Sequence, residues 1–214
     1  MASEESETSG SKTTRSYTIM KADTQEALEL AKKWWSNRSV PSYVSVRRLD
    51  KERLTEFVEV YNRCFIASPD PFCPLTNEQA AHLDTEGIFI ADLWGQIAGF
   101  IACFVERRQM SVFGEITGIG VLPSRRRRGI ATALIQRAVE YFLAAGVDEV
   151  YCEVYEKNIP SQMLILAYGF KEVGRRSVPI VSSLEDPETD LPGGKIMRRL
   201  GLRPRPGCEG CRDL

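Results

Sequence analysis

One short stretch of the sequence combines residue types that suit phosphate binding. It runs from Gly118 to Ala131 and contains four successive arginines, Arg125–Arg128. We expect a strand to end at Val121, a turn to follow at Pro123 and a helix to open at Gly129. A helix N-terminus presents unpaired backbone N–H groups and a partial positive charge, and an arginine can donate two parallel hydrogen bonds to phosphate oxygens. The stretch therefore predicts an anion site.

The same residues allow a second interpretation that involves no ligand. A run of four arginines usually forms a solvated basic turn. Arginine near a helix N-terminus also opposes the helix dipole, an unfavourable arrangement that an anionic ligand would relieve. Gly129 and Ala131 are small enough to let a diphosphate approach the backbone closely, which favours the ligand interpretation.

Two segments resemble the acetyl-CoA-binding segments of the GNAT superfamily of N-acetyltransferases. The first reads Val121-x-Pro123-x-x-Arg126-x-x-Gly129-Ile130-Ala131-x-x-Leu134. The second reads Glu153-Val154-Tyr155-Glu156-Lys157-Asn158, with Ser161, Leu164 and Gly169-Phe170 after it. Together they cover about sixty residues, and the preceding strands extend the resemblance to roughly 44–200. Both segments occur in the family's order and on the expected elements, which makes the resemblance specific.

The resemblance implies an α/β (α+β) fold with a mixed, mostly antiparallel sheet flanked by helices. Two parallel strands, Glu115–Val121 and Val150–Val154, would splay apart at their C-terminal ends and form the cleft for CoA. The resemblance assigns cofactor contacts to the strand residues Ile119, Gly120 and Val121, and to the loop and helix residues Arg126, Arg127, Arg128, Gly129, Ile130, Ala131 and Thr132. Pantetheine would pair with the strand, and the pyrophosphate would sit on the loop.

Asn158 has two roles that fit its type. The resemblance implies that it reaches the pantetheine arm. As an Asn ahead of Pro160 it equally suits the cap of a helix, and one side chain can serve both purposes.

The resemblance also implies a general base at Glu115, eleven residues before Arg126. An alkylamine with a pKa of about 10.4 is neutral in only about 1 molecule in 2500 at pH 7, so a proton acceptor assists the attack. Strand alternation places Glu115, Thr117, Ile119 and Val121 on one face. A rim glutamate paired with a nearby arginine is the alternative. Backbone N–H groups near Gly120 and Val121 would stabilise the oxyanion.

The chain departs from the family at the general acid. Many members have a Tyr seven residues after the Asn, whereas this chain has Ile165. Tyr168 is the catalytic candidate nearest in sequence, although a packing role beside Gly169 competes with it. Tyr155 and Cys152 are further candidates, and water or a slow turnover are the remaining options.

The elements that must position these residues follow from the hydrophobic pattern. Strands are expected at 17–20, 44–46, 88–93, 97–105, 112–121, 150–154, 171–177 and 196–200, and helices at 24–35, 54–61, 77–84, 130–145 and from 160. Thr24 and Asp50 are expected to cap helices. We divide the chain into a disordered segment 1–16, a β-α extension 17–43, an acetyltransferase domain 44–200 and a flexible basic tail 201–214.

Composition sets outer limits on function. The chain has 214 residues, 43% hydrophobic and 27% charged, with a net charge of -1, which does not favour nucleic acid or an anionic membrane. No apolar run is long enough for a membrane helix, and the N-terminus lacks the apolar stretch of a secretory signal. Six cysteines, four among apolar neighbours, suit the reducing cytoplasm. A metal role for Cys208 and Cys211 lacks further ligands, so we expect no metal.

The sequence thus predicts a cytoplasmic enzyme that moves an acetyl group from acetyl-CoA to a primary amine of a small molecule or a protein. A protein acetyltransferase acting on an α-amine or lysine is one alternative. A CoA-binding module without chemistry is another, and a nucleic-acid binder that uses Arg125–Arg128 and the basic segment from Lys195 onward is the last. A homodimer is compatible with the sequence. No motif in the sequence identifies the acceptor amine. Fold-level kinship alone cannot name a substrate.

Overall fold

The computed structural model describes residues 14–37, 43–70, 74–108 and 111–179. Its elements in chain order are β1 (Thr14–Asp23), α1 (Thr24–Asn37), β2 (Val44–Arg48), α2 (Leu54–Ile66), α3 (Asn77–Ala80), β3 (Ile88–Leu93), β4 (Gln96–Arg108), β5 (Ser111–Val121), α4 (Ile130–Ala144), β6 (Glu149–Tyr155), α5 (Ile159–Leu166) and β7 (Lys171–Pro179). Short 3-10 turns at Lys51–Arg53 and Pro123–Arg125 precede α2 and α4. No described helix is long and apolar enough to cross a membrane.

The predicted types and order of the elements are confirmed within the described residues, with shifted ends. β1 begins at Thr14 instead of Tyr17, because the polar residues before Tyr17 pair along β7, as Ser16 does with Ser177. α3 ends at Ala80, earlier than expected. The predicted strand 196–200 and the tail with its two cysteines lie outside the described residues.

Two predicted helix caps are wrong. The carboxylate of Asp23, not Thr24, caps α1, since its Oδ1 accepts a hydrogen bond of 2.8 Å from the Glu26 amide. Thr24 is fully buried instead. Asp50 forms no side-chain cap bond and pairs with Arg47 at 2.9 Å.

The seven strands form one sheet in the order β2-β3-β4-β5-β6-β1-β7. β1 lies inside this sheet, antiparallel to both β6 and β7, although it comes first in the sequence. The predicted mixed, mostly antiparallel sheet flanked by helices is confirmed. The segment that begins the described chain therefore contributes an internal strand beside the parallel pair.

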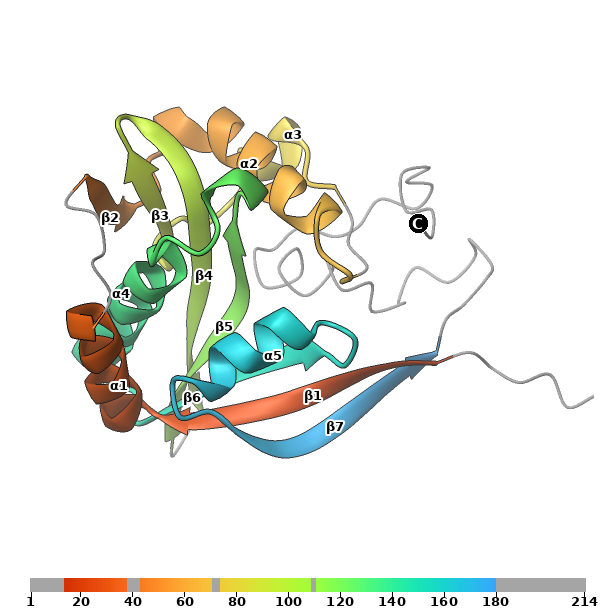
Figure 1. Ribbon diagram of the computed structural model, residues 1–214. Coiled ribbons are helices and arrows are strands. Elements are labelled where there is room, and N and C mark those ends of the chain that lie inside the picture. Colours follow the sequence, from red (N-terminus) through yellow and green to blue (C-terminus); the bar gives the residue numbers. More distant parts are fainter. Residues whose placement is uncertain (1–13, 38–42, 71–73, 109–110, 180–214) are drawn as a thin grey trace, which may run out of the picture.

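Among the described strands, β5 and β6 are the one parallel pair, and their pairing is short. It covers Phe113 to Ile116 on β5 and Glu149 to Cys152 on β6, and then stops. Figure 1 shows the consequence, since β3, β4 and β5 run steeply while β6, β1 and β7 run across the view. The predicted splay of the parallel strands is thus present.

A β-bulge in β5 changes which residues share a face. Ile116 pairs with Cys103 and Gly118 pairs with Ala102, so Thr117 is an extra residue outside the register, and its hydroxyl donates to the Ala102 carbonyl at 3.3 Å. An extra residue reverses the alternation of the side chains beyond it. The prediction that Glu115, Thr117, Ile119 and Val121 share one face is therefore wrong.

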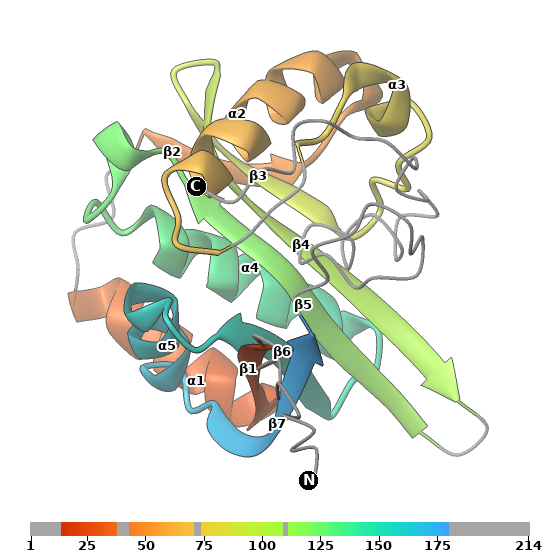
Figure 2. The same ribbon diagram turned by 90° about the vertical axis from the view of Figure 1, so that its right-hand side faces the viewer.

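Helices cover both faces of the sheet and divide the core in two. α1 and α4 pack together on one face (Figures 1 and 2), over a core that includes Phe89, Ile116 and Phe142. α2 and α3 cover the other face, over a core that includes Phe57 and Phe100. Ile119 and Val121 belong to the α4 side, whereas Glu115, paired with Phe104, lies on the α2 side.

Candidate functional site

A cleft opens where β5 and β6 part. Its walls are Ile116–Ile119 of β5 and Cys152–Val154 of β6, and α5 contributes Ser161 and Ile165. Other elements complete the lining with Tyr17, Phe65, Asp70, Asn158 and Arg176. The cleft holds about 780 Å³ of space, its open mouth included. Beyond Ile116 the edge of β5 that faces β6 has no strand partner among the described residues, so its backbone is available to a ligand in the cleft.

The arginine loop between β5 and α4 has the backbone geometry of an anion site. Arg127 and Gly129 both adopt left-handed conformations, with φ of 63° and 75°. Left-handed residues among right-handed ones turn successive N–H groups toward one concavity, which binds anions. Gly129 also stands at the N-cap of the 15-residue helix α4, where the first N–H groups have no partner within the helix.

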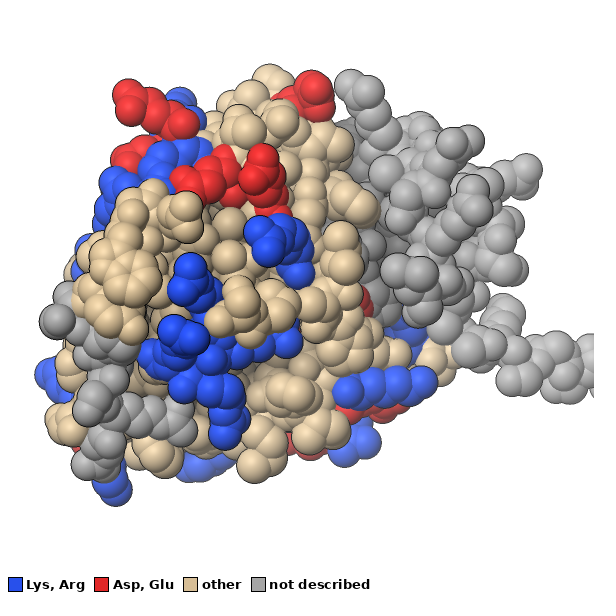
Figure 3. Space-filling model, turned by 45° about the horizontal axis from the view of Figure 1, so that its top comes forward, with Lys and Arg blue, Asp and Glu red and all other residues tan. Residues whose placement is uncertain are grey.

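The arginines of this loop differ in their placement. Arg126 donates from Nε to the Val121 carbonyl at 3.1 Å, which fixes the side chain against the end of β5. Arg127 and Arg128 are exposed. In the space-filling view (Figure 3) Lys and Arg side chains gather in one central area of the surface. Arg126 is thus the arginine of this loop whose side chain bonds to the backbone in the described structure, and the exposed Arg127 and Arg128 can reach a ligand.

Asn158 lies at the start of α5 and is 5% exposed. Its Oδ1 accepts a hydrogen bond of 3.2 Å from the Ser161 amide, so the helix-cap interpretation is confirmed. Its Nδ2 donates to the Asp70 carboxylate and, at 3.2 Å, to Ser68 Oγ. These contacts tie α5 to the segment that follows α2 and place Asp70 in the cleft.

Asp70 is the cleft carboxylate with a perturbed ionisation. Burial raises the pKa of Asp70 above its usual value, against hydrogen bonds from Ser68 (2.6 Å) and Asn158 that favour the charged form. A carboxyl whose charge is disfavoured in a cleft is a candidate for proton transfer or for binding a cation.

Tyr168 and Thr132 pair with each other away from the cleft. The Tyr168 hydroxyl lies 2.8 Å from Thr132 Oγ1, and the two residues are 2% and 1% exposed. Tyr168 packs in the core on the α4 side, together with Ile165. This arrangement favours a structural role for both side chains over the catalytic and cofactor-binding roles that the sequence suggests.

Glu115 lies on the sheet face toward α2, immediately before the cleft lining begins. In the parallel register it pairs with Tyr151 of β6. Glu153, two residues along β6, lines the cleft and bonds to Arg176 at 2.9 Å. The face that carries Glu115 is therefore the one from which the acidic residues approach the cleft.

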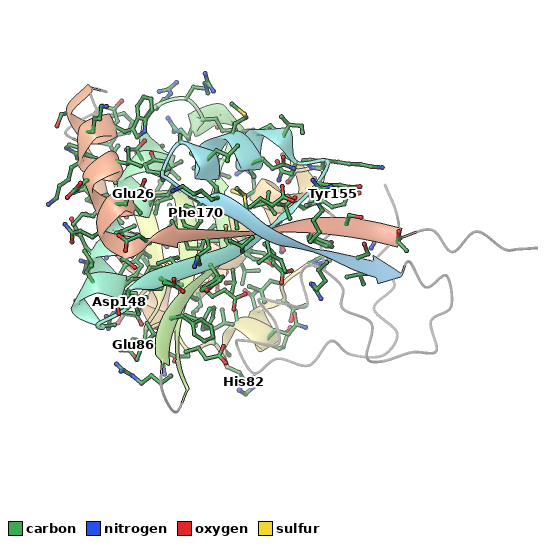
Figure 4. All side chains as sticks on the ribbon, turned by 90° about the horizontal axis from the view of Figure 1, so that it is seen from below. Glu26, His82, Glu86, Asp148, Tyr155 and Phe170 are labelled. Atoms are coloured by element: carbon green, nitrogen blue, oxygen red, sulfur yellow. The ribbon has the colours of Figure 1, made fainter. Side chains whose placement is uncertain are left out.

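The sequence did not identify several residues of the cleft. Tyr17 and Arg176 come from β1 and β7, whose places beside β6 are set by long-range pairing. Asp70 comes from an irregular segment after α2, and the sequence indicates it only as one of several acidic loop residues that could attract a cationic acceptor. Figure 4 shows Tyr155, which pairs with Tyr17 across the strands, at the end of β6 beside the start of α5.

Known proteins that are similar in sequence to this chain include N-acetyltransferases. The model of the acetyltransferase (GNAT) family matches residues 49–170. An uncharacterised N-acetyltransferase of Archaeoglobus fulgidus is 31% identical over 111 residues, which are 47% of this chain and 74% of that protein. An N-alpha-acetyltransferase of Sulfurisphaera tokodaii is 28% identical over 135 residues, or 59% of this chain and 81% of that protein.

A solved structure supports the same fold. AAC(6')-Iy, in complex with the bisubstrate analogue CoA-S-monomethyl-acetylneamine, superposes with a TM-score of 0.52 and 23% identity. The match covers 66% of this chain and 98% of that one. At this identity the likeness concerns the fold.

The environment of Asp70 generates a prediction about stability. A raised pKa in the folded state means that stability linked to this carboxyl is complete below its ordinary value of 3.8 and is lost as the pH rises through the folded-state pKa. Asp70→Asn keeps an acceptor for Ser68 and Asn158 but never ionises. We expect this variant to exceed the wild type in urea stability at about pH 8, by on the order of 1 kcal/mol, and to match it near pH 3.

The exposed Asp148 provides the control, because Asp148→Asn should change stability little at either pH. A D70N variant that is less stable than the wild type at pH 8 would show that the ionised carboxylate stabilises this segment, which would contradict a raised pKa of Asp70.

Proposed function

The chain belongs to the GNAT family of acetyltransferases, and on that premise we propose that it transfers the acetyl group of acetyl-CoA to a primary amine of a small molecule or a protein. The observation that carries the proposal is the separation of β5 and β6 after Ile116, next to the arginine loop. The free edge of β5 and the carboxylates of Asp70 and Glu153 line this opening, and β5 leads directly into the arginine loop and the N-terminus of α4.

The loop at Arg126–Thr132 suits the pyrophosphate of acetyl-CoA. Its left-handed Arg127 and Gly129 orient backbone N–H groups, and the N-terminus of α4 adds the helix dipole. The N–H groups of Ile130 and Ala131 belong to the same first turn. We propose that the exposed Arg127 and Arg128 contact the phosphates, while Arg126 holds the loop against β5.

The free edge of β5 suits the pantetheine arm. Ile119, Gly120 and Val121 pair with β4 on one side, and we propose that their remaining backbone groups bond to the amides of pantetheine and polarise the thioester carbonyl. Asn158 is a proposed contact as well. Because its Nδ2 already bonds to Ser68 and Asp70, contact with pantetheine requires that Ser68 be exchanged for a pantetheine carbonyl.

The acetyl transfer needs a proton acceptor. Deprotonating an alkylammonium of pKa about 10.4 at pH 7 costs about 4.6 kcal/mol. We propose that Glu115 receives this proton, directly or through water, while the amine nitrogen attacks the carbonyl carbon. Asp70, in the cleft itself, would attract the positive charge of the incoming amine. Holding the amine and the thioester together supplies much of the remaining acceleration.

A specific observation supports one acceptor class as a second candidate. The Sulfurisphaera tokodaii relative is named an N-alpha-acetyltransferase and is matched over 81% of its length. Protein N-terminal α-amines are therefore the alternative acceptors. Peptides with free α-amines, lysine peptides and small polyamines, screened with acetyl-CoA by mass spectrometry, would separate the classes.

We also propose a cytoplasmic location. Cys64 and Cys103 are free thiols buried in the protein. Buried thiols without disulfides are typical of a reducing compartment.

The phosphate site is tested by Gly129→Val. A β-branched residue is strained at a φ of 75°, so the N–H groups of the loop should turn away from the pyrophosphate. We expect the Kd for CoA, measured by titration calorimetry, to rise by at least about tenfold.

Gly146→Val is a matched control at the other end of α4. Gly146 has a φ of 71° with nothing near its missing Cβ, so this variant suffers the same backbone strain without touching the loop. Both variants should lose similar stability, and only the first should lose affinity. Equal affinities in the two would refute the phosphate site.

The proposed base is tested by Glu115→Gln. The amide cannot accept the proton, so we expect kcat with a responsive amine to fall by about 100-fold at pH 7, with little change in the Kd for CoA. Glu140 of α4, which bonds to Gln136 away from the cleft, provides the control Glu140→Gln. If E115Q keeps full activity while D70N loses it, Asp70 is the base and the assignment of Glu115 is wrong.

A further inference from the structure

The hydroxyl of Tyr17 is the unexplained polar group of the cleft. Tyr17 lies on β1, lines the cleft and is 6% exposed. Its hydroxyl is buried and has no hydrogen-bond partner among the residues that the structure describes. A buried hydroxyl without a partner is unfavourable, so its retention in a cleft points to a partner that arrives with a ligand.

The fold brings this phenol to the place where the parallel strands have separated. Tyr17 pairs with Tyr155 at the end of β6, and the two rings lie 5.5 Å apart. The Arg176 guanidinium lies over the Tyr17 ring, 5.7 Å from its centre. Tyr155 and Arg176 thus hold the Tyr17 ring in place. Tyr17 and Asp70 both line the cleft.

The residues on the opposite wall of the cleft are poor proton donors. Ile165 on α5 is apolar, and the Tyr168 hydroxyl is bonded to Thr132 in the core. The Cys152 thiol lines the cleft but is a weak donor. Within the described residues, Tyr17 is the phenol that lines the cleft.

We propose that the Tyr17 hydroxyl contacts the thioester sulfur of acetyl-CoA and donates its proton as the thiol leaves. This inference rests on the proposed acetyl transfer and adds a catalytic residue to it. The amine nitrogen bonds to the carbonyl carbon, the carbon–sulfur bond breaks with its electron pair on sulfur, and the sulfur takes the phenolic proton. The phenolate then recovers the proton that the carboxylate took from the amine, through water.

The ionisation of Tyr17 agrees with a donor role. Burial raises the pKa of Tyr17 well above its ordinary value, so the phenol keeps its proton at neutral pH. Arg15 and Arg176 act in the opposite direction and Asp70 and Tyr155 in the same one, with burial the largest effect. A CoA thiolate, with a pKa near that of cysteine at about 8.5, gains from a proton donor as it departs.

The direct test titrates the thiol of CoA bound to the protein, followed by thiolate absorbance in the ultraviolet. A phenol that donates to the sulfur favours the thiolate, so Tyr17→Phe should raise the pKa of the bound thiol by about one pH unit. Tyr61 of α2 is 1% exposed and lies outside the cleft, and Tyr61→Phe should leave that pKa unchanged. An unchanged thiol pKa in Y17F would overturn the proposal.

Turnover provides the second measurement. With an amine that the wild type acetylates, Y17F should lose about 100-fold in kcat and keep its KM for acetyl-CoA. Its thermal stability should equal or exceed that of the wild type, because a buried hydroxyl without a partner is removed. A loss of activity in Y155F with full activity in Y17F would assign the proton to the neighbouring tyrosine and overturn the proposal.

The experiments distinguish failure of the proposed acetyl transfer from failure of the proposed role of Tyr17. If the wild type does not bind CoA at all, the proposed acetyl transfer fails. If the wild type binds CoA and acetylates an amine while Y17F matches it in thiol pKa and in kcat, only the role of Tyr17 fails.

Discussion

The separation of two parallel strands is the constraint on which the remaining features of the site depend. β5 and β6 pair for only four residues each and then part after Ile116 and Cys152. Each parting strand leaves an edge whose backbone groups need partners. The bulge at Thr117 coincides with the end of this pairing and increases the local twist of β5. A cleft at this point is therefore a property of the backbone before any side chain is considered.

The first strand of the chain stabilises the half of the sheet that lies beyond the cleft. β1 pairs with β6 over seven positions, from Tyr17 with Tyr155 to Asp23 with Glu149. This pairing gives β6 a partner on the side away from β5, so β6 can leave β5 without losing its place in the sheet. The same pairing brings Tyr17 into the cleft. One strand thus supports the opening and contributes a phenol to its lining.

Features encoded by neighbouring residues could be predicted from the sequence, whereas pairings between distant strands could not. The strand, the Pro123 turn and the helix at Gly129 are encoded within about a dozen residues, and all three occur as predicted. The cap at Asn158 is equally local. The bulge at Thr117 was invisible because a single extra residue leaves the hydrophobic pattern of β5 almost unchanged. The pairing of β1 with β6 joins residues that are 126 to 138 positions apart, which periodicity does not encode.

The central claim is that the parted strands and the arginine loop receive CoA, and hydrogen exchange tests it directly. We expect CoA to slow amide exchange at residues 117–121 of β5 and 126–132 of the loop and α4, while the buried strand β3 exchanges as before. Equal exchange at 117–121 and 126–132 with and without saturating CoA would contradict the claim.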